Sequence, residues 1–511
     1  MDPKPSSSFF RALRDPAAFT LTMELVPGRG GRGDSHLRAL EVVRRAVADG
    51  RLAAVSITEN AGGHVALSPE VLGVEIRELG LEVIVHLSCK DKNRNQMESQ
   101  LFAWDRLGIR DLLVITGDYP QPGYRGLAKP VFDLDSVQAL ELIGRLNRGE
   151  GFAAGGVRPE QATAFVRGVA LSPFKHSEPE LLMQYYKLHR KLAAGADFII
   201  TQVGYDARKF QEVLFYLRHH GFGQVPVLGN VFIPSLRVAE LMYRGVIPGC
   251  VITDELYSQI RREAASPDKG KQARLTRAAT LLAVLKGLGY AGAHIGGPGL
   301  SYDDIASVLD QAEAMAPDWQ ALVPRLNFWP EDSCHLFRRD PRTGLNLEEM
   351  VPPREPAGEM LRYRLAHLAH QEGFIPGGLF YRPFKRACLA LDDSRLGWGL
   401  VQIEYLLKFI AFGCQNCGDC TLAELAYLCP QSACAKYLLN GPCGGSRDGW
   451  CEVYPGRRRC IYVRAYRRLM GAGKTAALKE GLVPPRDWSL NNSSSWANYF
   501  RGLDHNRSDP E

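Results

Sequence analysis

The stretch EVIVHLSCKDKNRNQMESQLFAWDRLGIRDLLVITG spans residues 82–117 and decides the fold class of this chain. It contains two short apolar runs, Glu82 to Ser88 and Asp111 to Gly117, with an amphipathic segment of helical length between them. The order strand, helix, strand is the unit from which parallel sheets are built. The same rhythm recurs at roughly 30-residue spacing from residue 19 to residue 297, so one such unit follows another.

Eight runs of this kind can be counted along the chain. The other six are Phe19 to Val26, Leu52 to Thr58, Val166 to Leu171, Asp197 to Val203, Val225 to Val231 and Ala293 to Gly296. Helical spacing of apolar residues lies between them, for example over His36 to Ala48. Eight such units predict a (β/α)8 TIM barrel. A doubly wound sheet is the alternative, but the glycine run at 28–33 lacks the helix-opening pattern of a phosphate-binding turn, and we interpret it as an active-site loop.

The composition is that of a folded protein, and the length of 511 residues suggests about two to four domains. The net charge of +6 comes from scattered residues, which gives no support for nucleic-acid binding. Residues 1–10 lack the apolar run of a signal peptide, and no apolar stretch is long enough for a membrane span. We therefore expect a cytoplasmic protein without a membrane span.

Polar residues stand at the carboxyl ends of the predicted strands, where a barrel carries its chemistry. They include Glu24, Thr58, His86, Asp118, Gln202 and His294. A buried, hydrogen-bonded structural role is the ordinary alternative for any one of them. As a set they predict an active site at that end of the barrel.

Short motifs at these strand ends carry a family resemblance. They are Met23 to Pro27, Val55 to Thr58, His86 to Cys89, Gly117 to Pro120, Pro173 to His176, Ala194 to Ala196 and Ile200 to Gln202. In order and spacing they resemble the methylenetetrahydrofolate reductase family of flavin-dependent barrels over residues 19–300. The resemblance implies that 5,10-methylenetetrahydrofolate and 5-methyltetrahydrofolate are interconverted by hydride transfer through FAD, or through FMN. The electrons would come from NAD(P)H or through an electron-transfer protein.

The resemblance also implies roles for single residues. Glu24 corresponds to the general acid that protonates N10 of the folate, and a carboxylic acid can serve near neutral pH if burial raises its pKa. Asp118 corresponds to a residue that contacts the folate and lies near the flavin, and Gln202 to one that hydrogen-bonds the pterin. The implied flavin-binding residues are Thr58, His86, Asp118, His176 and Lys191.

Two residues depart from the better-known members of the family. Thr116 stands where an arginine is common, and Ser172 stands where a tyrosine is expected. The resemblance implies that both positions lie near the outer half of the flavin. The choice between FAD and FMN, and the docking of NADH, therefore stay open.

Nine of the twelve cysteines lie within residues 388–460. In a reducing cytosol such clustering predicts a metal or iron–sulfur site rather than disulfides. The candidate ligands are Cys414, Cys417, Cys420, Cys429, Cys434, Cys443, Cys451 and Cys460. The spacing of the first three is typical of a [4Fe–4S] cluster, although the fourth follows later than in ferredoxins, and zinc held by four thiolates is the alternative.

The segments Asn440 to Gly445 and Asp448 to Val453 resemble the small C-terminal domain of anaerobe-type methylenetetrahydrofolate reductases. This resemblance implies a redox relay or a structural metal module beside the barrel. We expect a barrel over 1–300, a connecting segment over 301–385 with a short helix near 363–371, a cysteine-rich domain over 386–490 and a loosely packed polar tail over 491–511.

Two other functions remain open at this stage. One is a folate-binding partner module for methyl transfer or electron transfer that has no reductase activity of its own. The other is a zinc-dependent methyltransferase, which the cysteine spacing makes less attractive. A redox partner subunit or a homo-oligomer is compatible with each of these functions.

Overall fold

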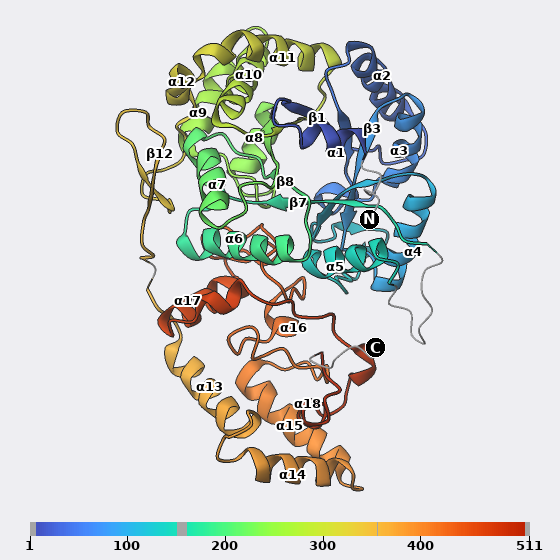
Figure 1. The fold of residues 1–511 in the computed structure, drawn as a ribbon, viewed down its shortest axis with the longest axis vertical. Helices are drawn as coiled ribbons and strands as arrows, with labels where there is room; N and C mark the ends of the chain where they lie inside the picture. The colour runs from blue at the N-terminus through green and yellow to red at the C-terminus, as the bar shows by residue number, and fades with distance from the viewer. Residues whose placement is uncertain (1–6, 151–160, 355, 506–511) are drawn as a thin grey trace.

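The computed structural model describes residues 7–150, 161–354 and 356–505. Eight parallel strands close into a barrel in the order β1-β10-β9-β8-β7-β4-β3-β2. Figure 1 shows the barrel in the upper part of the molecule. The strands are β1 (Thr20–Leu25), β2 (Ala54–Ile57), β3 (Glu82–Ser88), β4 (Asp111–Ile115), β7 (Val166–Leu171), β8 (Phe198–Thr201), β9 (Val227–Phe232) and β10 (Gly292–Gly296). All eight predicted strands are confirmed, and the closed order excludes the doubly wound sheet.

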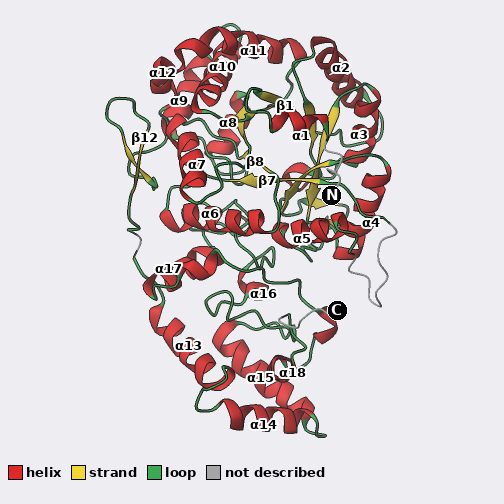
Figure 2. Cartoon of the chain, viewed as in Figure 1, coloured by secondary structure: helices red, strands yellow, loops and turns green. Residues whose placement is uncertain are grey.

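Helices surround the strands on the outside (Figure 2). They are α2 (Asp34–Asp49), α3 (Pro69–Glu78), α4 (Arg94–Arg106), α5 (Ser136–Asn147), α6 (Glu178–Ala193), α7 (Ala207–His219), α8 (Leu236–Tyr243), α9 (Asp254–Glu263), α10 (Lys271–Leu288) and α11 (Tyr302–Met315). Local sequence sets their ends: Asp135 and Gln138 form a capping box before α5, and Gly50 ends α2 in the left-handed conformation. None of the helices in the described ranges is both long and apolar enough to cross a membrane.

A short helix closes the amino end of the barrel. Helix α1 (Ser8–Leu13) places Phe9 and Leu13 among strand residues such as Phe198, and the rings of Phe9 and Phe198 meet edge to face at 5.5 Å. Ser7 Oγ fixes this helix by donating to Asp111 Oδ1 at 2.7 Å. Helix α1 thus covers the amino ends of the strands, and the carboxyl ends form the other end of the barrel, which we call its mouth.

The segment after the barrel is more regular than expected. Helix α11 is the outer helix that follows the eighth strand and packs on α10, so the barrel continues past residue 300. A two-stranded hairpin follows, made of β11 (Phe337–Arg339) and β12 (Asn346–Met350). The predicted short helix is part of α13 (Met360–Phe374), after which comes α14 (Tyr381–Asp392).

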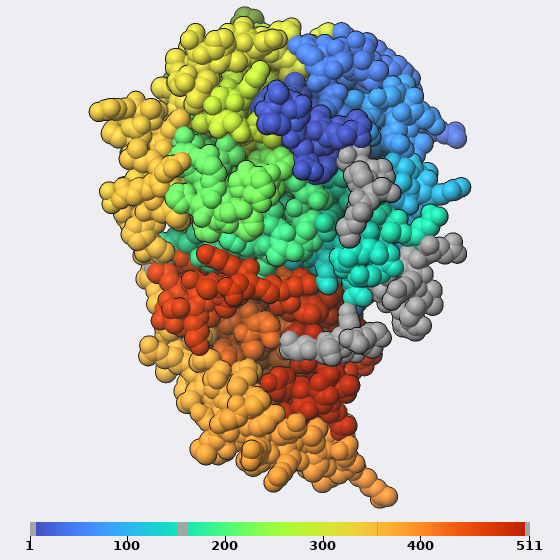
Figure 3. Space-filling view, in the orientation of Figure 1, coloured from blue at the N-terminus to red at the C-terminus, as the bar shows by residue number. Residues whose placement is uncertain are grey.

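The C-terminal part consists of helices joined by long loops, and it lies against the barrel near α5 and α6 (Figures 1 and 3). Its helices are α15 (Gly397–Phe412), α16 (Pro430–Ala433), α17 (Ile461–Gly471) and α18 (Ser495–Arg501). All eight candidate ligand cysteines lie in or beside the loops between α15 and α17.

The expected loose tail is instead packed as far as His505. Helix α18 buries Phe500 near Leu400, and the His505 ring lies 2.6 Å from a carboxylate oxygen of Asp419. Apolar Ala497 and Phe500 and the buried His505 anchor a segment whose overall polarity predicted disorder. Residues 506–511 of the predicted tail lie outside the described residues.

Candidate active site

A cavity of about 270 Å³ lies at the carboxyl ends of the barrel strands. Its wall includes six residues that the sequence analysis placed there: Glu24, Thr58, His86, Asp118, Lys191 and Gln202. These side chains come from different strand ends and from α6, yet they share one chamber because the strand ends converge. We call this chamber the mouth cavity.

Glu24 faces two histidines inside the mouth cavity. Its Oε2 lies 3.9 Å from Nε2 of His294, whose Nδ1 lies 2.8 Å from Oγ1 of Thr22. Burial raises the pKa of Glu24, but the neighbouring His294, with a smaller contribution from His86, outweighs it and holds the pKa below its ordinary value. Burial thus acts in the direction that the sequence analysis considered, but sequence alone did not reveal that His294 comes close enough to reverse the net shift.

The second histidine, His86, is buried on β3 with its Nε2 2.6 Å from Oγ of Ser56. Burial lowers the pKa of His86 to about 4, although the charge of Glu24 opposes this shift. The imidazole is therefore neutral near pH 7 and offers a hydrogen bond to a ligand without adding charge.

Asp118, Gln202 and Lys191 are each held by a backbone group. Asp118 Oδ2 accepts from the Gly62 amide at 2.8 Å, and Gln202 Oε1 accepts from the Val203 amide at 2.8 Å. Lys191 Nζ donates to the Ala170 carbonyl at 2.7 Å, and burial lowers the pKa of Lys191 to about 7. These contacts hold the side chains in place around the cavity.

Apart from Glu452 Oε1, which is ion-paired with Lys436, four buried polar atoms of the cavity wall have no hydrogen-bond partner in the described parts of the chain. They are Thr58 Oγ1, Ser172 Oγ, Gln184 Nε2 and Asn230 Oδ1. Buried polar atoms are nearly always paired, so these four indicate a polar ligand. Two hydroxyls, one amide donor and one amide acceptor suit a ring edge that alternates donors and acceptors, as the edges of flavin and pterin do.

The C-terminal domain forms the roof of the mouth cavity. Its roof loop, residues 441–446, is held by two buried lysines of the barrel. Lys175 Nζ donates to the carbonyls of Gly444 and Ser446, the latter at 2.6 Å, and Lys187 Nζ donates to the Pro442 carbonyl at 3.0 Å. Lys187 Nζ also lies 3.3 Å from Thr116 Oγ1. A cation therefore lies beside Thr116, which stands where an arginine is common in the family that the sequence resembles.

The eight cysteines divide into two sets that line two separate small cavities. The distal set is Cys414, Cys417, Cys420 and Cys429, and the proximal set is Cys434, Cys443, Cys451 and Cys460. Cys443 also lines the mouth cavity, so the proximal set shares a wall with it. Within the described ranges no three His, Cys, Asp or Glu side chains converge closely enough to hold a single metal ion.

Cationic groups point at the sulfurs of the distal set. Arg486 Nη1 lies 2.7 Å from Cys417 Sγ, and Lys408 Nζ lies 3.2 Å from Cys420 Sγ. Donors of this kind stabilise thiolates, which are the form in which cysteine binds metals. The donor set therefore fits an anionic thiolate-held group.

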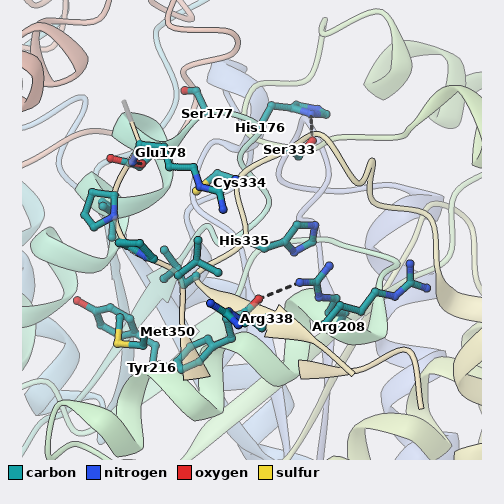
Figure 4. Close-up of a pocket in the computed structure, with 18 of the residues that line it drawn as sticks. His176, Ser177, Glu178, Arg208, Tyr216, Ser333, Cys334, His335, Arg338 and Met350 are labelled. Atoms are coloured by element: carbon teal, nitrogen blue, oxygen red, sulfur yellow. Dashed lines mark hydrogen bonds between the residues drawn. The ribbon is translucent and has the colours of Figure 1, made fainter. Parts of the chain in front are cut away.

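His176, the seventh residue that the sequence analysis named, lies outside the mouth cavity. Its ring stacks on Trp329 at 4.6 Å, and its Nδ1 lies 2.9 Å from Oγ of Ser333. It borders a separate groove of about 820 Å³ between α6, α7 and residues 331–354, shown in Figure 4. The loop after β7 turns outward toward the connecting segment, a direction that the motif alone did not indicate.

Sequence reasoning missed other residues of the mouth cavity. Gln184 and Lys187 lie on α6, and Asn230 lies within β9, so neither a strand end nor a motif marked them. His294 was noted only for its place at the end of the last strand.

Fold and site together define a (β/α)8-barrel protein whose acid-bearing cavity is completed by a cysteine-rich second domain. Residues 10–295 match the family model described as methylenetetrahydrofolate reductase, and residues 398–489 match the model described as methylene-tetrahydrofolate reductase C terminal. Because the first match covers more than half of the chain, the chain belongs to the methylenetetrahydrofolate reductase family.

Curated relatives match only over parts of their length. A probable methylenetetrahydrofolate reductase (NADPH) of Caenorhabditis elegans is 27% identical over 169 residues, which is 32% of this chain and 23% of the relative. The 5,10-methylenetetrahydrofolate reductase of Salmonella typhimurium is 28% identical over 159 residues, which is 30% of this chain and 46% of the relative. The chain thus spans about a quarter to a half of the length of these relatives.

One solved structure is an uncharacterised Clostridium thermocellum protein described as binding two copies of 5-methyl-5,6,7,8-tetrahydrofolic acid. It aligns with 61% of this chain and 99% of its own, at 11% identity and a TM-score of 0.40. A likeness at that level does not establish a shared fold.

Proposed function

We propose that this chain is a methylenetetrahydrofolate reductase that interconverts 5,10-methylenetetrahydrofolate and 5-methyltetrahydrofolate by hydride transfer. Family membership supports the reaction class. The observation that carries the proposal is Glu24, which stands in the mouth cavity between His294 and His86 and beside four unpaired polar atoms. A partly buried acid among hydrogen-bonding groups is what a folate ring opened by protonation requires.

Glu24 is the proposed proton donor. Opening the five-membered ring requires a proton on N10, after which the cationic substrate can accept a hydride. A substrate that fills the cavity removes water from the carboxylate, and this raises the pKa of Glu24 toward the range of a general acid. His294 Nε2 lies 3.9 Å from Glu24 Oε2 and is oriented by Thr22, so it faces the carboxylate of the proposed donor.

Asp118 and Gln202 are the proposed substrate-binding residues. The Asp118 carboxylate is fixed by the Gly62 amide and stabilises the positive charge that develops on the opened substrate. The amide of Gln202 offers a donor and an acceptor to the pterin edge. Both side chains line the same cavity as Glu24.

The residues of the mouth cavity fit a flavin, which when bound supplies the hydride. Thr58, His86, Asp118 and Lys191 are the residues that we propose hold it, and Ser172 and Gln184 add two unpaired polar atoms. FAD is the expectation from the family and FMN fits the same ring contacts. Either NAD(P)H or an electron-transfer protein acting through the cysteine domain would provide the electrons.

We infer further that each cysteine set holds a [4Fe–4S] cluster. A zinc ion keeps four sulfurs about 2.3 Å from its centre, whereas a cubane holds its thiolates apart around a larger body. Sulfurs that surround a cavity without converging on one point, with cations beside them, favour the cluster.

The variant Glu24→Gln tests the proposed proton donor. Glutamine keeps the size of the side chain and cannot donate the proton, so we expect folate-dependent turnover to fall by about 100-fold or more while bound flavin stays unchanged. Stopped-flow reoxidation of the reduced enzyme by methylenetetrahydrofolate measures this loss. Glu41→Gln, an exposed position on α2, is the matched control, and near-normal turnover of Glu24→Gln would remove the assignment.

A further inference from the structure

The C-terminal domain places a buried ion pair in the wall of the mouth cavity. Lys436 and Glu452 are only 4% and 5% exposed at their side chains, and the Lys436 ammonium contacts the Glu452 carboxylate directly. Both residues line the cavity that contains Glu24 and Asp118. The barrel fold alone therefore does not supply the whole charge pattern of this site.

Lys436 is attached to the strand end that carries Asp118. Its Nζ donates to the Gly117 carbonyl at 2.7 Å, immediately before Asp118, and lies 5.7 Å from the centre of the Phe132 ring. The ammonium is thus fixed by a carbonyl, a ring face and a carboxylate. A fixed, desolvated charge acts more strongly on its surroundings than a mobile one in water.

Glu452 packs against the roof loop. Its Oε2 lies so close to Gly445 that a Cβ at this glycine would stand 1.1 Å from it. Only glycine leaves room for the carboxylate there. Burying an ion pair costs desolvation energy, and an apolar pair of similar size is often as stable, so the pair adds little to folding. A role in the chemistry of the adjoining cavity explains its presence better.

We propose that Lys436 and Glu452 are positioning residues, supplied by the C-terminal domain, that set the balance between oxidised and reduced flavin in the mouth cavity. The inference rests on the proposed function, since a flavin must occupy the cavity. The reduced, deprotonated flavin carries one more negative charge than the oxidised form, so a nearby cation favours it and a nearby anion opposes it. The two members of the pair therefore act in opposite directions.

The test is the flavin reduction potential of two charge-removing variants. We expect Lys436→Met to lower the potential and Glu452→Gln to raise it, each changing the ratio of affinities for reduced and oxidised flavin by about tenfold, or ~30 mV for a two-electron couple. The double variant should return toward the wild-type value. Where a variant loses its flavin on purification, titration with oxidised and with reduced flavin measures the same ratio.

Two further variants separate charge from structural damage. Lys436→Arg keeps the charge and should keep the potential, and Lys474→Met removes one positive charge from an exposed site on the same domain and should leave it unchanged. Shifts of the same sign in both single variants, or no shift in either, would overturn the inference while leaving the proposed function intact. A wild-type chain that binds no flavin would contradict both this inference and the proposed function.

Discussion

At the scale of single residues, burial keeps His86 uncharged near pH 7. The pKa of His86 is lowered to about 4 by burial, against about 6.5 in an unfolded chain. As the pH falls from 6.5 to 4, the unfolded chain therefore binds a proton that the folded chain does not. The free energy of unfolding decreases by up to about 3 kcal/mol over this range. This stability is fully present above pH 6.5.

We expect His86→Gln to flatten this part of the pH dependence, because glutamine has no group that titrates there. Glutamine can also keep a hydrogen bond to Ser56. Denaturant unfolding of both proteins at pH 7, 5.5 and 4.5 measures the difference. Parallel pH profiles for the wild type and the variant would show that His86 does not carry this dependence.

The sequence could predict those site residues whose place follows from strand order. Glu24, His86 and Asp118 stand at strand ends or just after them, and a barrel brings strand ends together whatever its loops do. Gln184 and Lys187 could not be predicted, because their direction depends on the rotation of α6 and on a roof contributed by another domain. The place of His176 outside the mouth cavity could not be predicted either, because the direction of a loop is set by its tertiary contacts, here with Trp329.

At the scale of elements, periodic apolar runs predicted all eight strands within a few residues. The predicted strand ends were less accurate: β4 ends at Ile115, whereas the predicted run extends to Gly117. Helix α11 falls in the stretch that was predicted to be a connecting segment, although its apolar residues have helical spacing. Helix α18 was missed because a polar composition conceals a few well-placed apolar anchors such as Phe500.

The loops that carry the two cysteine sets lead to a prediction at the same scale. If each set holds its own cluster, Cys420→Ser disrupts the distal cluster alone, because Cys420 lines only the distal cavity. We expect the wild type to bind about eight irons per chain and the variant to lose about half, with its flavin content unchanged. Iron and acid-labile sulfide analysis of anaerobically purified protein measures this.

The control for this experiment is Cys388→Ser. Cys388 is buried between α14 and α18, outside both cysteine sets, so the variant should keep all of its iron. Complete loss of iron from Cys420→Ser would show that the sets are not independent. Zinc in place of iron in the wild type would contradict the cluster assignment.

At the scale of the whole molecule, two domains line the mouth cavity, which is the proposed active site. The barrel supplies the acid and the proposed folate and flavin contacts, and the C-terminal domain supplies the roof loop, the Lys436–Glu452 pair and Cys443. The proximal cysteine set thereby shares a wall with the mouth cavity. If the proximal set holds a redox cluster, the path of an electron from it to a ligand in the mouth cavity is short, because Cys443 lines both cavities.

The most direct measurement is an anaerobic half-reaction of the purified, full-length protein. The absorbance spectrum is recorded, and the flavin is then reduced with just enough dithionite that no free dithionite remains. Methylenetetrahydrofolate is added last. We expect the oxidised flavin band to return in proportion to the 5-methyltetrahydrofolate formed. A flavin that stays reduced would contradict the assignments of Glu24, Asp118 and Gln202, and a protein that binds folate but carries no flavin would instead be a folate-binding partner module.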